Sequence, residues 1–116
     1  MNASRIFKIM TTAQWESLQR TGHFDGAPVD LEDGYIHLST AGQVAETARR
    51  HFGGLAGLML LAVDAAVLGN ALRWEPSRGG QLFPHLYAPL SLTSVQWAHP
   101  LSLKADGSHL FPELDQ

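Results

Sequence analysis

Histidine is the most conspicuous chemical resource of this sequence. Six of its 116 residues are histidine, and a neutral imidazole can accept a proton, bind a metal or hydrogen-bond a sugar hydroxyl near neutral pH. His37 lies in the alternating stretch Tyr35-Ile36-His37-Leu38-Ser39, which is typical of a strand whose alternate residues share one face. We therefore expect His37 beside Tyr35 and Ser39, where this strand turns into a helix. The alternative is a hydrogen-bonded histidine with a structural role alone.

A second histidine, His85, stands in the apolar frame Phe83-Pro84-His85-Leu86-Tyr87. If this stretch is a strand, Phe83, His85 and Tyr87 share one face, and two aromatic rings flank an imidazole. Such a group suits stacking on a base or a nicotinamide ring. A core histidine bonded to a backbone carbonyl would give the same pattern.

Other polar residues stand at the predicted ends of elements. Glu75 lies between Trp74 and Pro76, at a strand end beside a rigid turn, where it is either a catalytic carboxylate or a solvated charge. Arg49 and Arg50 close a predicted helix. There they interact favourably with the helix C-terminus, and they could also clamp a phosphate.

Several classes of protein are excluded or disfavoured. The chain has no cysteine, so it has no disulfide, zinc-thiolate site, iron-sulfur cluster or thiol nucleophile. It has no G-x-S-x-G, Walker or G-x-G-x-x-G motif and no His-x-His pair, so we expect no metal. A net charge of −3 with dispersed basic residues argues against a duplex DNA binder. Without a long apolar run or signal pattern, we expect a cytoplasmic protein that does not bind membranes.

The elements that would position these residues form one domain. Strands are predicted at 5–10, 35–39, 58–63, 72–75, 83–87 and 94–98. One helix is predicted between Thr12 and Gly22 and a second from Gln43 to Phe52. We expect a loop at 23–33 whose acidic part, 25–33, is either a lid or a simple connection. From about residue 100 to 116 we expect a weakly ordered tail.

Three strings in the sequence carry a resemblance to a known family. They are Ile6-Phe7-Lys8-Ile9, Asp33-Gly34-Tyr35-Ile36-His37-Leu38-Ser39-Thr40 and Phe83-Pro84-His85-Leu86-Tyr87, with Gln43 between the last two. On these residues the chain, apart from its tail, resembles the uncharacterised bacterial DUF family 952.

That family is similar to the ADP-ribosyltransferase fold, and this chain is similar to the second half of RNA 2′-phosphotransferases. Those enzymes have an H-x-H-hydrophobic-S strand, an alanine-bearing helix ending in R-H, and an apolar strand ending in V-D. The matching elements here are the stretch 35–39, the helix with Ala45, Ala48, Arg50 and His51, and the stretch 60–64. Lys8, after Phe7, stands where such enzymes have a histidine that holds a ribose of NAD.

The resemblance implies roles for particular residues. Residues His37 and Ser39 would hold a ribose, Tyr35 or Tyr87 would stack on the nicotinamide, and Arg49 or Arg50 would meet phosphate. Developing positive charge would be stabilised by Glu75 or His85. The predicted catalytic residues are thus His37, His85 and Glu75. The predicted ligand-binding residues are Lys8, Tyr35, Ser39, Thr40, Arg49, Arg50 and Tyr87.

The sequence therefore predicts an α+β domain with a bent or split mixed sheet, two main helices and a cleft between the sheet halves. Three hypotheses of function follow. The first is an ADP-ribosyltransferase-like enzyme that acts on NAD or on a phosphorylated nucleotide or RNA end. The second is a module that binds a nucleotide or small ligand without turning it over, as Lys8 suggests. The third is a histidine-based metal-dependent enzyme, which needs at least three converging histidines.

Overall fold

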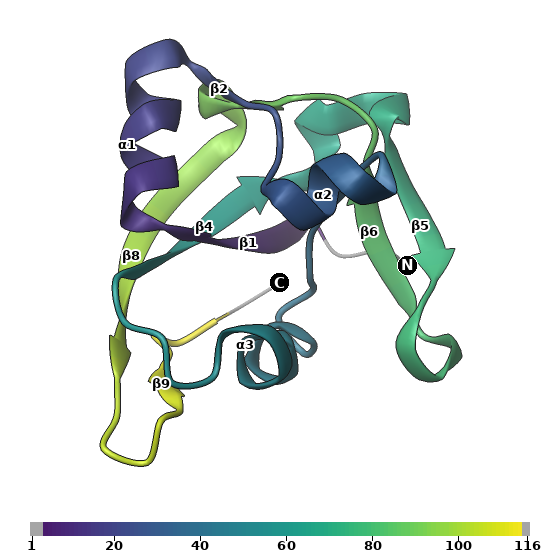
Figure 1. The fold of residues 1–116 in the computed structure, drawn as a ribbon. Helices are drawn as coiled ribbons and strands as arrows, with labels where there is room; N and C mark the ends of the chain where they lie inside the picture. Colours follow the sequence, from purple (N-terminus) through teal and green to yellow (C-terminus); the bar gives the residue numbers. More distant parts are fainter. Residues whose placement is uncertain (1–3, 115–116) are drawn as a thin grey trace.

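Two antiparallel sheets frame the protein in the computed structural model, which describes residues 4–114 (Figure 1). The larger sheet has the order β1-β4-β8-β9 and the smaller has the order β3-β6-β5, while β2 and β7 form a separate pair. The strands are β1 (Arg5–Thr11), β2 (His23–Phe24), β3 (Ile36–His37), β4 (Leu58–Asp64), β5 (Leu72–Pro76), β6 (Leu82–Leu86), β7 (Leu90–Ser91), β8 (Val95–Leu103) and β9 (His109–Leu110). The expectation of a single α+β domain with a bent, split sheet and a few helices is confirmed.

The two main predicted helices are present as α1 (Thr12–Thr21) and α3 (Val44–Phe52). The Thr11 hydroxyl accepts from the backbone N–H of Gln14, whose side chain accepts from the N–H of Thr11, so a capping box starts α1. Gly22, with a φ of 87°, ends α1 in the left-handed conformation. Short 3₁₀ turns cover 65–71, 78–80 and 92–94.

A third helix, α2 (Pro28–Asp33), replaces most of the predicted loop. Three local features form this helix. Pro28 stands in its first turn, the Asp30 carboxylate accepts from the N–H of Ala27 at 2.8 Å, and Gly34 closes it with a φ of 88°. In Figure 1, α2 lies in front of the region between β1 and β6. The prediction of a loop at 23–33 is therefore wrong for α2, since six residues are too few to show helical periodicity, and for His23–Phe24, which form β2.

The central strand β4 is buried on both faces, but its neighbours are antiparallel. Leu61 and Val63 belong to one core cluster, which includes Ile6, and Leu60 belongs to the other, which includes Phe7. Such an apolar run is typical of parallel sheets. Here the second face is covered by α3 and the end of the chain instead. Every strand pair in residues 4–114 is antiparallel, so the predicted mixed sheet is wrong.

The end of the chain is built into the larger sheet. Strand β8 continues through residue 103 and, after a turn, pairs with β9. Leu101 is buried, and His109 Nε2 lies 2.7 Å from the carbonyl oxygen of Leu55. The predicted weakly ordered tail is therefore wrong for residues 100–114, because Leu101, Phe111 and Leu114 pack against the core. Residues 115–116 lie outside the described residues.

Within residues 4–114, the two sheets meet at one backbone bridge. Phe7 of β1 and Ser39, just beyond β3, exchange N–H···O bonds of 2.7 and 2.9 Å. Gln43, at the start of α3, ties this helix to the smaller sheet, since its side-chain amide donates to the carbonyl of Leu82 in β6 at 2.8 Å. These contacts place β1 and the β3-β6 pair on two sides of one interior space.

The burial of both faces of β4 leads to a stability prediction. Leu60→Ala and Leu61→Ala should each lower the free energy of unfolding by about 2–5 kcal/mol, because each removes buried methyl groups from a different cluster. Val67→Ala, at an exposed position, is the control and should change it by less than about 0.5 kcal/mol. Urea unfolding measures all three values. A large cost at only one leucine would contradict burial on two faces.

Candidate functional site

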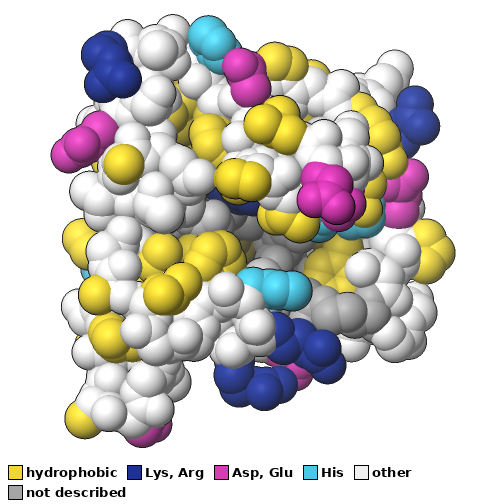
Figure 2. All heavy atoms as spheres, in the orientation of Figure 1, with side chains coloured by type: hydrophobic (Ala, Val, Ile, Leu, Met, Phe, Trp, Pro, Cys, Tyr) yellow, Lys and Arg dark blue, Asp and Glu magenta, His cyan; other side chains and the backbone are white. Residues whose placement is uncertain are grey.

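A pocket of about 660 Å³ lies where β1, α2, β3, α3 and β6 meet. Figure 2 shows this face hollowed near its centre, with histidine and cationic side chains along the lower edge of the hollow, over α3. Aromatic and aliphatic walls come from Phe7, Ile9, Phe52 and Phe83, while the polar lining includes Lys8, Asp30, Asp33, Tyr35, His37, Ser39, Thr47, His51 and His85. This size and mixture are typical of small-molecule sites.

Asp30 is the centre of the polar network on one side of the pocket. Its side chain is 1% exposed. Its Oδ2 atom lies 3.0 Å from Lys8 Nζ, and its Oδ1 atom accepts from the backbone N–H of His37 at 3.1 Å and contacts His37 Nδ1 at 2.6 Å. Lys8 Nζ also donates to the carbonyl of His37 at 3.0 Å. Asp30 thus joins β1, α2 and β3.

The ionisation of this network follows from its burial and its pairing. Burial alone would raise the pKa of Asp30, but the hydrogen bond from His37 and the charge of Lys8 outweigh it. That pKa therefore lies well below its ordinary value. Burial lowers the pKa of Lys8 against the opposing effect of Asp30. Asp30 is thus a charged hydrogen-bond acceptor across the neutral pH range.

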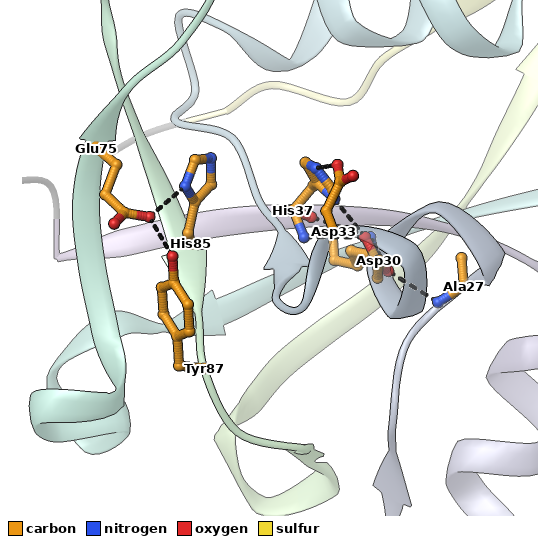
Figure 3. Close-up of polar contacts among 8 residues, drawn as sticks. Ala27, Asp30, Asp33, His37, Glu75, His85 and Tyr87 are labelled. Carbon is orange, nitrogen blue, oxygen red and sulfur yellow. Dashed lines mark hydrogen bonds and ion pairs between the residues drawn. The ribbon is translucent and has the colours of Figure 1, made fainter.

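His37 contacts two carboxylates at once (Figure 3). Its Nδ1 atom faces Asp30 Oδ1, and its Nε2 atom lies 2.9 Å from Asp33 Oδ2. An ionised carboxylate can only accept, so a ring nitrogen that carries a proton donates to it. The His37 ring thus has a buried carboxylate on one nitrogen and a partly exposed carboxylate on the other.

His85 has one carboxylate partner, on the side away from His37. Its Nδ1 atom lies 2.7 Å from Glu75 Oε1, which also accepts from the Tyr87 hydroxyl at 2.8 Å (Figure 3). These two hydrogen bonds lower the pKa of Glu75, and the bond to Glu75 raises the pKa of Tyr87. Where Nδ1 donates to Glu75, a neutral His85 ring has its lone pair on Nε2. His85 also lines the pocket.

Tyr35 brings the two histidines together. Its ring stacks on His85 with centroids 4.1 Å apart and lies 4.7 Å from the His37 ring and 5.3 Å from the Tyr87 ring. The two histidines are direct partners across β3 and β6, with ring centroids 5.7 Å apart. Burial, followed by the charges of Asp33, Glu75 and Asp30, raises the pKa of Tyr35, which keeps its hydroxyl protonated.

The structure brings together many of the residues that the sequence singles out. Lys8, Tyr35, His37, Ser39 and His85 all line the pocket. Ile36 belongs to the core cluster that includes Ile6, whereas Leu38 belongs to that cluster and also lines the pocket.

Other predicted residues lie outside the pocket lining. Glu75 stands behind His85, and Tyr87 bonds Glu75 and contacts the ring of Tyr35. Arg49 and Arg50 lie on the exposed side of α3, where both pair with Glu46. Thr40 starts α3 through its backbone, which bonds Gln43 and Val44.

Sequence reasoning missed Asp30 and Asp33 as partners of His37. A signal for Asp30 was present, because Lys8 lies in the middle of a strand whose other inner residues are apolar, and a buried cation requires an anion. Pro28 two residues earlier marks the first turn of a helix that can present this carboxylate. For Asp33, spacing i to i+4 from His37 offered no signal, because Gly34 ends the helix between them.

The sequence matches the model of the family described as "Protein of unknown function (DUF952)" over residues 9–98. The chain belongs to the DUF952 family. The X-ray crystal structure of protein CC0527 from Caulobacter crescentus is 49% identical to it, covers 91% of this chain and 93% of that one, and has a TM-score of 0.89. A solution NMR structure of CC0527 also matches, with 49% identity, coverage of 91% of each chain and a TM-score of 0.82. Among curated proteins, none matches this sequence.

Two further observations concern this DUF952 protein as a whole. Its helices within residues 4–114 are all too short or too polar to cross a membrane. Over the same residues, no group of three or more His, Asp or Glu side chains is arranged to hold a metal ion. The hypothesis of a histidine-based metal enzyme thus has no ligand set in the described part of the DUF952 chain.

The buried carboxylate of this DUF952 protein leads to a prediction on acid stability. Asp30 has a lowered pKa in the folded state, so the unfolded chain binds its proton first as the pH falls. The stabilisation is present above the ordinary aspartate pKa of about 3.9 and is lost progressively below it. Between pH 6 and pH 3 the wild type should therefore lose more free energy of unfolding than Asp30→Asn does.

Chemical denaturation at a series of pH values measures this difference. Glu32→Gln, which removes an exposed carboxylate from the same helix, is the matched control and should keep the wild-type pH profile. Equal slopes for wild type and Asp30→Asn would show that Asp30 does not stabilise the fold through its charge.

Proposed function

We propose that the pocket binds a nucleotide and that the protein is an ADP-ribosyltransferase-like enzyme, with NAD or a phosphorylated nucleotide or RNA end as its substrate. One observation carries the proposal. An oriented histidine, His85, stands in a pocket between two sheets, beside a tyrosine ring and a second histidine that contacts two carboxylates. Concave sites in which a few polar groups converge on apolar walls are the usual places for ligand chemistry.

The walls of the pocket suit the parts of a nucleotide. Phe7, Phe52 and Phe83 supply apolar surface for a base or nicotinamide ring. Ser39 and Thr47, whose hydroxyl oxygens lie 3.1 Å apart, supply hydrogen-bonding groups for a ribose. His37 and His51 add nitrogen-bearing side chains to the same lining, and such groups, when protonated, favour phosphate oxygens.

His85 has the arrangement of a general base. In transfer from NAD, the bond between ribose C1′ and the nicotinamide nitrogen breaks, and nicotinamide leaves with the electron pair. An acceptor hydroxyl oxygen bonds to C1′, and its proton goes to Nε2 of His85. Glu75, already bonded to Nδ1, stabilises the imidazolium that forms. Glu75 is thus a positioning residue rather than a group on the ribose itself.

Binding is tested first. Titration calorimetry and thermal shift with NAD, ADP-ribose and a 2′-phosphorylated dinucleotide should show binding of at least one of them, because a ligand of the native state stabilises it by mass action. His37→Ala should abolish that binding. His99→Ala removes an exposed histidine on β8 and should leave the dissociation constant unchanged. No binding of any of the three at millimolar concentration would overturn the nucleotide proposal.

Turnover is tested next with the ligand that binds. His85→Ala should lower the rate of nicotinamide or phosphate release by about 10²- to 10⁴-fold, the usual contribution of a general base. Tyr87→Phe keeps the bond between Glu75 and His85 and should lower the rate by only a few fold. Chromatography of the released product measures both rates. A His85→Ala protein with the wild-type rate would contradict the role of His85.

A binding module without turnover is the second candidate function, and Lys8 favours it. Its Nζ atom is bound to Asp30 and to the carbonyl of His37. In this arrangement Lys8 serves the fold, and it does not hold a ribose as the histidine of the similar transferases does. Binding without product release in the same assays would select this function.

A further inference from the structure

We infer that His37 Nε2 is the anion-binding point of the pocket and that a phosphate oxygen of the ligand takes the place of Asp33 there. This inference rests on the proposed function and narrows it, because it names the group of the nucleotide that His37 contacts. It also makes Asp33 a residue that sets affinity by competing with the ligand.

Only one ring nitrogen of His37 can exchange its partner. Nδ1 faces Asp30, which is 1% exposed and is also bound to Lys8 and Ala27. Loss of the contact between Nδ1 and Asp30 would leave a buried carboxylate with fewer donors, which is costly. A ligand can therefore reach His37 only at Nε2.

Nε2 of His37 is in contact with a negatively charged group. Its partner in the structure is a carboxylate oxygen at 2.9 Å, Asp33 Oδ2. An anionic oxygen thus already lies against Nε2, and Nε2 of a protonated ring donates to such an oxygen. A neutral ribose hydroxyl would replace a charge-assisted contact with a weaker one.

The Asp33 carboxylate can move away from Nε2 of His37 at little cost in free energy. Its side chain is 42% exposed, so water can solvate the carboxylate once it has moved. It is the last residue of α2, where a negative charge faces the negative end of the helix dipole and does not stabilise the helix. The contact with His37 accounts for the placement of Asp33 better than helix stability does.

Lys8, the other nitrogen-bearing side chain of this wall, cannot take the same role. Lys8 Nζ is held by Asp30 and by the carbonyl of His37, both at 3.0 Å. In the lining contributed by β1 and β3, His37 is therefore the side chain whose anionic partner can be exchanged.

The experiment compares two variants, at neighbouring positions, each of which removes one negative charge. Asp33→Asn removes the competitor of the ligand, and Glu32→Gln removes an equal charge from an exposed neighbour, so both change the net charge alike. Calorimetry with ADP-ribose, which carries phosphates, and with adenosine, which does not, gives the dissociation constants. We expect Asp33→Asn to bind ADP-ribose about three- to tenfold more tightly than the wild type and Glu32→Gln. Adenosine binding should not change, and adding His37→Ala to Asp33→Asn should remove the gain.

The outcomes separate this inference from the proposed function. ADP-ribose that binds the wild type and Asp33→Asn equally would overturn the inference and leave the nucleotide pocket standing. Weaker ADP-ribose binding by Asp33→Asn would place Asp33 on the ligand as a contact, which also overturns competition. An equal gain in ADP-ribose affinity in Glu32→Gln would show that net charge alone causes the effect, which also overturns the inference. If neither ADP-ribose nor adenosine binds any of the proteins at millimolar concentration, the inference and the proposed function are both overturned.

Discussion

A single buried carboxylate holds together the parts of this protein that form its pocket. Asp30 binds Lys8 of β1, the backbone and ring of His37 in β3, and the N–H of Ala27 at the start of its own helix. Each partner satisfies an oxygen that would otherwise be desolvated at a cost of several kcal/mol. The position of α2 over the space between the sheets is therefore fixed by charge pairing, not by an apolar face, since Val29 and Leu31 of α2 are exposed.

This constraint also determines what the pocket contains. The two sheets are joined by one backbone bridge, between Phe7 and Ser39, and by the Lys8–Asp30–His37 network beside it. With β1 and β3 held at this point, the pairing of His37 with His85 brings a residue of β6 to the same space. Glu75 of β5 then reaches His85 from behind. The Phe7–Ser39 bridge and the pairings of β3 with β6 and of β6 with β5 thus fix the position of His85 relative to the buried Lys8.

Local sequence patterns predict the helices and strands well, but they predict poorly which strands pair with one another. Alternation over 35–39 and 83–87 identifies the faces of His37 and His85, because side chains alternate across any extended strand. The same alternation does not say that the two strands are neighbours or that Tyr35 stacks on His85. Asp30 is found neither by alternation nor by helical period, since α2 is six residues long and the partner, Lys8, lies 22 residues away. The apolar run at 58–63 specifies burial on both faces of β4, which antiparallel and parallel neighbours satisfy equally.

The two histidines differ because their carboxylate partners differ. His37 lies between two carboxylates, Asp30 and Asp33. His85 has one carboxylate, Glu75, on Nδ1. Both rings contact Tyr35, so one pocket holds two imidazoles with different partners and with centroids 5.7 Å apart. Similar titratable groups in different surroundings can take different roles in a reaction. The acidic residues around this pocket therefore give two identical side chains two distinct environments.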